Sequence, residues 1–437
     1  MCKDNTDSST KLVTKMDGTR KHAWVIEPPT ANNNTASLTD DGVEFIAAHK
    51  YKPGHYTVLD AILNPIWTSL TELLPLSLAP NMVTFIGALH CGLSYAITWY
   101  HAPNFDRPLP DWVVFLSGYC TIAYYTFDCM DGKQARRTGQ SSPLGQLFDH
   151  GFDCICNLAH LSTSAGYLML GGLTQKDSRF FFGFQGSLFF AFFMAQWEEY
   201  YTGALPHAMG NLGVTEVNYA IGTVAIINAF IDRENWMATL GSVIPQQVLN
   251  MVGGVIPDYF LEMQLKHLGM CGWYLLGVVL ITGCLARVIG HDNVKKNKLA
   301  FIALSKLLTP FLICIAPYWL PPSILQNELR FISVAGGLLM SFLSKKIICF
   351  SMAKQTFASI QIEALPYLAT LLWIRYDRNL SDQGARFVLG GLCVWNAFRL
   401  IKFASIAIDQ ICTRLDINCM TIKEKKVDDA DAWKKVH

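Results

Sequence analysis

Long apolar stretches follow one another along the chain from about residue 80 onward, and each approaches the length of a membrane span. A helix needs about 20 predominantly apolar residues to cross the hydrocarbon core of a bilayer. The pattern therefore predicts an all-α, polytopic integral membrane protein with about ten transmembrane helices. The predicted spans are 82–100, 111–134, 147–172, 180–200, 214–231, 270–290, 298–319, 330–350, 359–376 and 386–408.

The residues before the first span follow a different pattern. Residues 1–43 are polar and include the run Asn32-Asn33-Asn34, which predicts a disordered cytosolic tail. In 44–79 apolar residues recur at helical spacing among polar ones, which predicts an amphipathic helix. It either lies on the membrane surface or packs against the protein's own helices, and the pattern favours neither. The apolar positions are Leu59, Ile62, Leu63, Ile66, Trp67, Leu70 and Leu73.

Composition agrees with a membrane protein. Of the 437 residues, 51% are hydrophobic and 16% are charged, whereas soluble domains average about 25% charged residues. Such a chain is not intrinsically disordered. The 35 Lys and Arg residues balance the 34 Asp and Glu residues. There is thus no basic excess of the kind that indicates a nucleic-acid partner, and membrane lipids are the expected surroundings.

Basic residues in short connections indicate which side of the membrane they face, because Lys and Arg are enriched on the cytosolic side. The connections 132–139, 292–298 and 345–354, the last with Lys345 and Lys346, are predicted to be cytosolic. The chain ends Lys434-Lys435-Val436-His437. This ending resembles a dilysine retrieval signal, so we expect the membrane of the endoplasmic reticulum or of the Golgi.

Four aspartates lie at the ends of two strongly apolar stretches: Asp128, Asp131, Asp149 and Asp153. Each pair is spaced by three or four residues and so shares one face of its helix. If the two helices pack antiparallel, the four carboxylates converge near one membrane surface. Such a cluster needs compensating charge, and oxygen ligands suit Mg²⁺, Mn²⁺ or Ca²⁺. Two such ions would suit phosphoryl displacement.

The residues between the pairs suit a phosphate-bearing ligand. Gly132, Ala135 and Gly145 remove bulk beside the helix backbone. Arg136 offers a bidentate fork to phosphate. Together with the acids they predict a nucleotide-diphosphate site. The alternative is an ion-pair network between helices, but one arginine does not neutralise four acids.

This constellation resembles the signature of the CDP-alcohol phosphotransferase family. The matching residues are Asp128, Asp131, Gly132, Ala135, Arg136, Gly145, Asp149 and Asp153. The strings from Asp131 to Thr138, from Ser142 to Gly145 and from Leu147 to His150 are similar to the eukaryotic choline/ethanolamine phosphotransferase branch. Gln146 departs from that pattern, in which a glutamate is expected.

The resemblance implies a reaction. The hydroxyl of diacylglycerol attacks the β-phosphorus of CDP-choline or CDP-ethanolamine, giving phosphatidylcholine or phosphatidylethanolamine and CMP. It also implies that Asp128, Asp131 and Asp149 bind Mg²⁺ or Mn²⁺, as two ions, with Asp153 completing the set. Either His150 or Asp153 is the implied base, and His150 is slightly preferred. A second interpretation of His150 is that it orients Asp149.

Further residues are expected to contact the CDP-alcohol. Asn81 and Thr84 belong to a Pro-Asn-x-x-Thr element of the family, although Asn also caps helices. Lys133 lies within the signature. Glu198 and Glu199, flanked by aromatic residues, are candidates for binding the ammonium headgroup, or else they form part of an interfacial belt.

These expectations divide the chain into five regions. The tail 1–43 precedes the amphipathic region 44–79. Catalytic helices follow in 80–231, and the helices of 232–410 line a lipid path or form homodimer contacts. A cytosolic tail, 411–437, ends the chain. The alternatives are a family member with another acceptor, or a cation transporter that uses the aspartate cluster.

Overall fold

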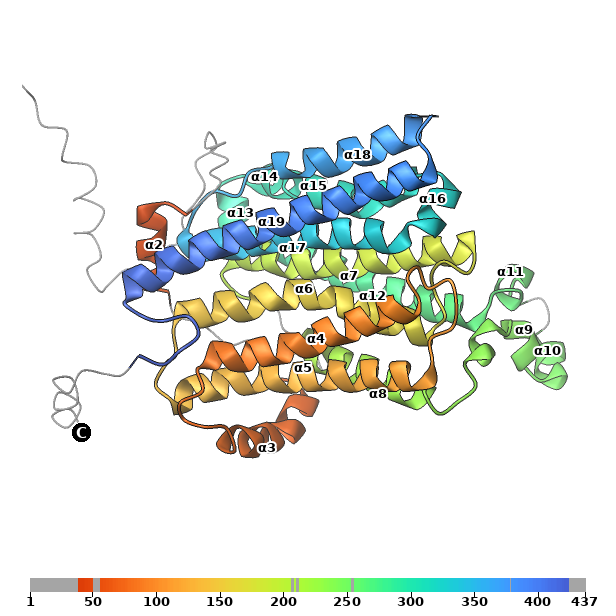
Figure 1. Ribbon diagram of the computed structural model, residues 1–437, viewed down its shortest axis with the longest axis horizontal. Helices are drawn as coiled ribbons and strands as arrows, with labels where there is room; N and C mark the ends of the chain where they lie inside the picture. Colours follow the sequence, from red (N-terminus) through yellow and green to blue (C-terminus); the bar gives the residue numbers. More distant parts are fainter. Residues whose placement is uncertain are drawn as a thin grey trace, which may run out of the picture.

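Long helices that run alongside one another make up most of the described chain (Figure 1). The computed structural model describes residues 38–49, 56–205, 208–209, 212–252, 255–377 and 379–423. The longer helices are α2 (Asp40–Ala47), α3 (Val58–Glu72), α4 (Pro80–His101), α5 (Asp111–Arg137), α6 (Pro143–Tyr167), α7 (Gln175–Thr202), α8 (Val214–Asn228), α12 (Leu265–Gly290), α17 (Leu329–Ala353), α18 (Leu365–Tyr376) and α19 (Asp382–Leu415).

Short elements connect them. β1 (Ala208–Met209) and β2 (Leu212–Gly213) form an antiparallel pair. The short helices are η1 (Arg233–Met237), α9 (Leu240–Val243), α10 (Gln246–Val252), α11 (Asp258–Leu261), α13 (Asp292–Lys296), α14 (Ala300–Ser305), α15 (Leu308–Ile315), η2 (Ala316–Trp319), α16 (Pro322–Asn327) and η3 (Ile362–Ala364). The fold is therefore all-α, as predicted.

Six segments of the described chain are long and apolar enough to cross a bilayer: α4, α7, α12, residues Ala300–Trp319, α17 and α19. They confirm a multi-pass membrane protein. The count of ten stays a prediction, because α5, α6, α8 and α18 fall outside this set. The 12 residues of α18 extend only about 18 Å, less than the hydrocarbon thickness.

The helices that carry the aspartates are held by their neighbours. α5 packs against α4 and α8, and α6 packs against α4 and α17. A Cβ atom at Gly118 of α5 would lie 2.6 Å from the carbonyl oxygen of Gly222 of α8, so glycine permits this close approach. Proline at the first turn starts both α4 and α6. α7 ends at Gly203, which has a φ of 74°.

The predicted amphipathic region has two different faces in α3. Trp67 is buried and its Nε1 donates a hydrogen bond of 2.9 Å to the hydroxyl of Tyr219 on α8. Ile62, Ile66 and Leu73 are exposed. One face thus packs on the bundle, and the exposed face is the one expected to contact the membrane.

The boundary predicted for the N-terminal tail is wrong at its end. Residues 1–37 lie outside the described chain, but α2 begins at Asp40, before the predicted limit at 43. Thr39 caps this helix, and Val43 and Ile46 are buried where α2 packs on α17 and α19. Contacts with α17 and α19 therefore stabilise a helix that begins before the predicted boundary.

The prediction that Lys345 and Lys346 stand in a cytosolic connection is also wrong. α17 continues to Ala353. The Nζ of Lys346 is buried and donates to Gln361 Oε1 and Glu363 Oε1, each at 2.9 Å. A buried carboxylate partner compensates the lysine charge inside the bundle. The dilysine pair at 434–435 lies outside the described residues.

Candidate active site

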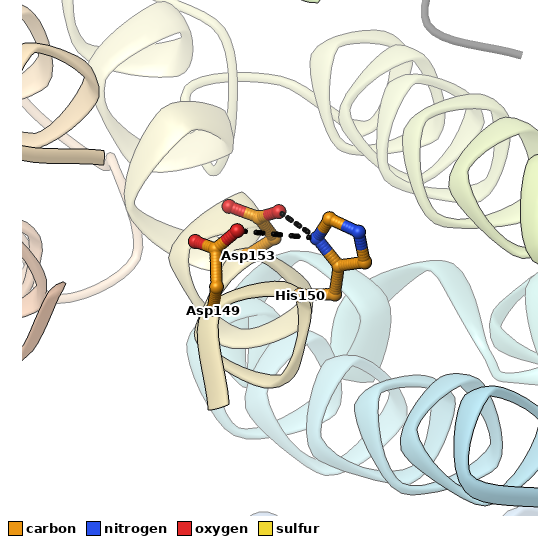
Figure 2. Close-up of side chains that lie close together, drawn as sticks. All are labelled: Asp149, His150 and Asp153. Atoms are coloured by element: carbon orange, nitrogen blue, oxygen red, sulfur yellow. Dashed lines mark ion pairs between the residues drawn. The ribbon is translucent and has the colours of Figure 1, made fainter. Parts of the chain in front are cut away.

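The four aspartates predicted to converge do so where α5 ends and α6 begins. One carboxylate oxygen from each of Asp128, Asp131 and Asp149 lies within 4.8 Å of the other two. A second group at the same spacing joins Asp149, Asp153 and a ring nitrogen of His150. Figure 2 shows this second group on one stretch of α6. Asp149 belongs to both groups and links them.

The end of α5 is fastened to the segment before α4. Gln134 is buried, and its Nε2 donates to the carbonyl oxygens of Pro75 and Leu78 at 2.9 and 3.0 Å. Arg137 Nη1 donates to the carbonyl oxygen of Leu74 at 2.7 Å. Gly139, with a φ of 65°, then reverses the chain toward α6. These contacts fix the helix turn that carries Asp128 and Asp131.

Two hydroxyl groups orient two of the acids. Thr84 on α4 donates a hydrogen bond to Asp131 Oδ2, and Tyr124 on α5 donates one to Asp153 Oδ1. By contrast, Oδ1 of Asp128 and Oδ1 of Asp149 are buried and have no hydrogen-bond partner among the described residues. Buried carboxylate oxygens without a donor are costly. Clustered carboxylate oxygens that lack a hydrogen-bond donor fit a divalent metal such as Mg²⁺ or Mn²⁺.

His150 lies beside these acids. Its Nδ1 is 3.4 Å from Asp149 Oδ2 and 3.6 Å from Asp153 Oδ2. In Figure 2 the other ring nitrogen lies on the side away from both carboxylates. With Nδ1 directed at the acids, the neutral imidazole is protonated there and its Nε2 carries the lone pair.

Two cavities meet at this cluster. The first, which we call the polar cavity, measures about 370 Å³ and lies among the N-terminal ends of α4 and α6, the end of α5 and residues 417–422. The second, which we call the apolar cavity, measures about 380 Å³ and lies among α5, α6, α7, α8 and α12. Asp128, Asp149 and His150 line both cavities. The acids therefore stand between a polar compartment and an apolar one.

Most of the predicted nucleotide contacts line the polar cavity: Asn81, Gly132, Ala135, Arg136 and Gly145. A Cβ atom at Gly132 would lie 3.6 Å from Arg136 Nη1, and one at Gly145 would lie 3.9 Å from Asn81 Oδ1. Because Gly132 and Gly145 have no side chains, they leave room between Arg136 and Asn81. Thr84 acts through Asp131 instead.

The other predicted contacts lie elsewhere. Lys133 points to α3, where its Nζ donates to Asn64 Oδ1 and to Thr68 Oγ1. Glu198 is buried, and Nε and Nη2 of Arg287 donate to its two carboxylate oxygens at 2.6 and 2.8 Å. Glu199 is buried near Lys354. Burial lowers the pKa of Lys354 to about 8, and the Glu199 carboxylate opposes that shift.

Two residues that were not predicted from the sequence also touch the site. Tyr124 precedes Asp128 by one helical turn, so the same spacing argument that grouped the acids places it on their face. Arg287 lines the apolar cavity from α12. No local signal connects it with Glu198, because the pairing depends on how α12 packs on α7.

Helices in a membrane, with clustered acids between a polar and an apolar cavity, define a membrane enzyme that joins a water-soluble substrate to a lipid. Comparison with known proteins agrees. Residues 77–243 match the family model described as CDP-alcohol phosphatidyltransferase. This region contains all four aspartates and His150.

Some curated relatives are similar over almost their whole length, and others over a little more than half of it. Choline/ethanolaminephosphotransferase 2 of Arabidopsis thaliana is 30% identical over 398 residues, which cover 88% of this chain and 98% of that protein. Choline/ethanolaminephosphotransferase 1 of the same plant is 28% identical, covering 87% and 97%. Cholinephosphotransferase 1 of Homo sapiens is 32% identical, covering 60% and 58%. The chain belongs to the CDP-alcohol phosphatidyltransferase family and is a transferase.

Tyr124→Phe tests the contact with Asp153. Loss of a hydrogen bond to a charged group in the site is expected to lower kcat roughly 10-fold, because Asp153 then loses its orienting donor. The comparison variant is Tyr119→Phe, since Tyr119 is exposed on the same helix. Equal activity of Tyr124→Phe and the unaltered protein would show that the hydrogen bond to Asp153 does not contribute to turnover.

Proposed function

We propose that the protein transfers phosphocholine, phosphoethanolamine or both from the CDP-alcohol to diacylglycerol, releasing CMP. The observation that carries this proposal is the meeting of the polar and apolar cavities at Asp128, Asp149 and His150. A water-soluble donor and a membrane-dissolved acceptor need separate routes to one reacting centre, and the two cavities supply them.

The polar cavity suits the CDP-alcohol. Arg136 presents a fork-shaped cation that binds phosphate oxygens, and Gly132 and Gly145 leave room beside it. Asp128, Asp131 and Asp149, completed by Asp153, would hold Mg²⁺ or Mn²⁺, as two ions. A divalent metal held there would neutralise charge on the diphosphate and assist the departure of CMP.

The apolar cavity suits diacylglycerol. Leu188, Phe192 and Ile221 are among its lining residues. It extends along α12 from Arg287 to Trp273, a stretch of about 21 Å at 1.5 Å per residue. The outer faces of α8 and α12 carry exposed apolar side chains such as Ile227 and Leu275. These helices border the bilayer, from which an apolar acceptor enters sideways.

His150 is proposed as the base for the attacking hydroxyl. Its Nε2 takes the hydroxyl proton as the new oxygen–phosphorus bond forms, and the electron pair of the breaking bond leaves on the phosphate of CMP. Asp153, held by Tyr124, faces Nδ1 and favours the tautomer that this role needs. His150 lines both cavities, whereas Asp153 lines only the apolar one.

We further propose that Glu198 and Glu199 bind the ammonium headgroup of the donor. Glu198 stands beside the apolar cavity in its pair with Arg287. The ammonium of the donor would approach from the side of His150, which faces the charge of Glu199. We also propose that the protein lies in the membrane of the endoplasmic reticulum or of the Golgi and that its site faces the cytosol, because the CDP-alcohol is water-soluble.

The decisive experiment measures CMP release and lipid product from purified protein in liposomes. The liposomes contain diacylglycerol and Mg²⁺, with either CDP-choline or CDP-ethanolamine as donor. Product with one or both donors, abolished by a chelator, is the expected result, and the ratio of the two products assigns the headgroup. Absence of product with both donors, from folded protein, would reject the proposal in favour of another acceptor.

Gly277→Leu tests the lipid route. Gly277 lines the apolar cavity, and a leucine there projects into the space occupied by the acceptor. The apparent KM for diacylglycerol is expected to rise about 10-fold, a typical effect of a steric change in a hydrophobic pocket. The KM for the CDP-alcohol should stay unchanged.

Gly272→Leu is the matched control, because Gly272 lies on the same helix and a Cβ atom there meets nothing within 4 Å. If both variants bind diacylglycerol equally well, the cavity is not the acceptor route.

A further inference from the structure

After its last long helix, the chain returns to line the polar cavity. α19 ends at Leu415, beyond the boundary of 410 predicted from sequence. Asp416 then turns the backbone with a φ of 53°. We call residues 416–423 the C-terminal strap. Lys423 Nζ donates to the carboxylate of Asp416, so the last residue of the strap is joined to its first.

The strap forms one wall of the polar cavity. Its lining residues are Ile417, Asn418, Cys419, Thr421 and Ile422. Ile417 and Cys419 also pack against the hydrophobic core. The strap therefore has a fixed place beside the acids, although it lies outside the matched family region, which ends at residue 243.

A hydrogen bond connects the strap to Asn81. The side-chain Nδ2 of Asn81 donates to the carbonyl oxygen of Cys419 at 2.8 Å. Asn81 is 8% exposed, and an amide so enclosed is held in one orientation by such a bond. Its Oδ1 then faces the space above Gly145. Nδ2 also donates to Cys419 Sγ at 3.7 Å, so Asn81 offers the lone pairs of its Oδ1 to a ligand.

We propose that the C-terminal strap completes the CDP-alcohol site, by positioning Asn81 and by enclosing the nucleoside end of the donor. This inference rests on the proposed function. The diphosphate belongs near Arg136 and the acids. The strap offers uncharged polar side chains, Asn418 and Thr421, between two isoleucines. That combination suits the polar edge and apolar faces of a nucleobase rather than a phosphate.

Truncation of the chain tests whether the C-terminal strap contributes to binding of the CDP-alcohol. A chain ending at Leu415 lacks the strap, and a chain ending at Lys423 keeps it and serves as the matched control. The first is expected to raise the KM for the CDP-alcohol about 10-fold or more, since it loses both a wall and the bond to Asn81. The KM for diacylglycerol should not change. An unchanged or lower KM for the CDP-alcohol would overturn the proposal.

The double variant Asn418→Ala/Thr421→Ala covers the case in which the truncated chain does not fold. It is expected to raise the same KM and to leave the KM for diacylglycerol unchanged. No change in either constant would show that these side chains do not contact the donor.

Alkylation gives a readout that needs no turnover. Cys419 on the strap and Cys129 on α5 both line the polar cavity. CMP is expected to slow the reaction of N-ethylmaleimide with both cysteines in the full-length protein, measured by peptide mass spectrometry. Protection of Cys129 alone would overturn the role of the strap.

This assay also distinguishes the two proposals. If the wild-type protein releases no CMP from any CDP-alcohol, the proposed function fails. Protection of Cys419 by CMP would even then support a nucleotide site closed by the strap, and its absence would reject both.

Discussion

Asp131→Asn is expected to reduce kcat/KM for the CDP-alcohol by at least about 100-fold. Even the loss of an outer partner of a metal ligand typically costs 10- to 100-fold, and Asp131 is proposed as a direct ligand. Its carboxylate lies within 4.8 Å of those of Asp128 and Asp149 and accepts the hydroxyl hydrogen of Thr84. The amide keeps the size of the side chain but removes its charge, so the divalent metal loses an anionic oxygen.

The measurement combines product formation with titration of Mg²⁺ or Mn²⁺. The variant should need more metal for half-maximal rate, or show no rate at all. Asp106→Asn is the control, because Asp106 lies in an exposed connection and pairs with Arg107. A variant at Asp131 that retained the normal rate and metal dependence would contradict the metal site.

His150→Ala is expected to lower kcat about 10²- to 10⁴-fold while the protein still binds the CDP-alcohol. General base catalysis contributes this range, and His150 is the imidazole at which both cavities meet. The readouts are kcat from product formation and the dissociation constant of the CDP-alcohol by direct binding.

Titration of the metal distinguishes a His150 that acts as the base from a His150 that only orients Asp149. A base can be removed without changing the metal requirement, whereas loss of an orienting partner weakens metal binding. His101→Ala, at the far end of α4 from the site, is the control. Near-normal turnover of His150→Ala would assign the proton to another group, with Asp153 the first to test.

The acid cluster was predictable because its information is local. The spacing from Asp128 to Asp131 and from Asp149 to Asp153 places each pair on one face of a helix, and a short connection brings the two helices together. Gly132, Ala135, Arg136 and Gly145 lie on the same turns, so they line the polar cavity together.

Contacts between residues far apart in the sequence were less predictable. Lys133 belongs to the same signature, yet it turns to α3, because on a helix one step along the chain rotates the side chain by about 100°. The pairing of Glu198 with Arg287 depends on the packing of α7 against α12. The charge pattern predicts Lys346 in a cytosolic connection, but its buried partner Glu363 lies 17 residues further along the chain.

By itself, then, the sequence determined that this protein is a helical membrane protein in which four aspartates converge, and it predicted that they serve a nucleotide diphosphate. Hydropathy and helical periodicity act over one helix at a time, and that is enough to specify such features. The tertiary structure alone decided that two cavities meet at the acids and that residues 416–423 lie against Asn81. These depend on contacts between helices distant in the chain, for which the local pattern carries no signal.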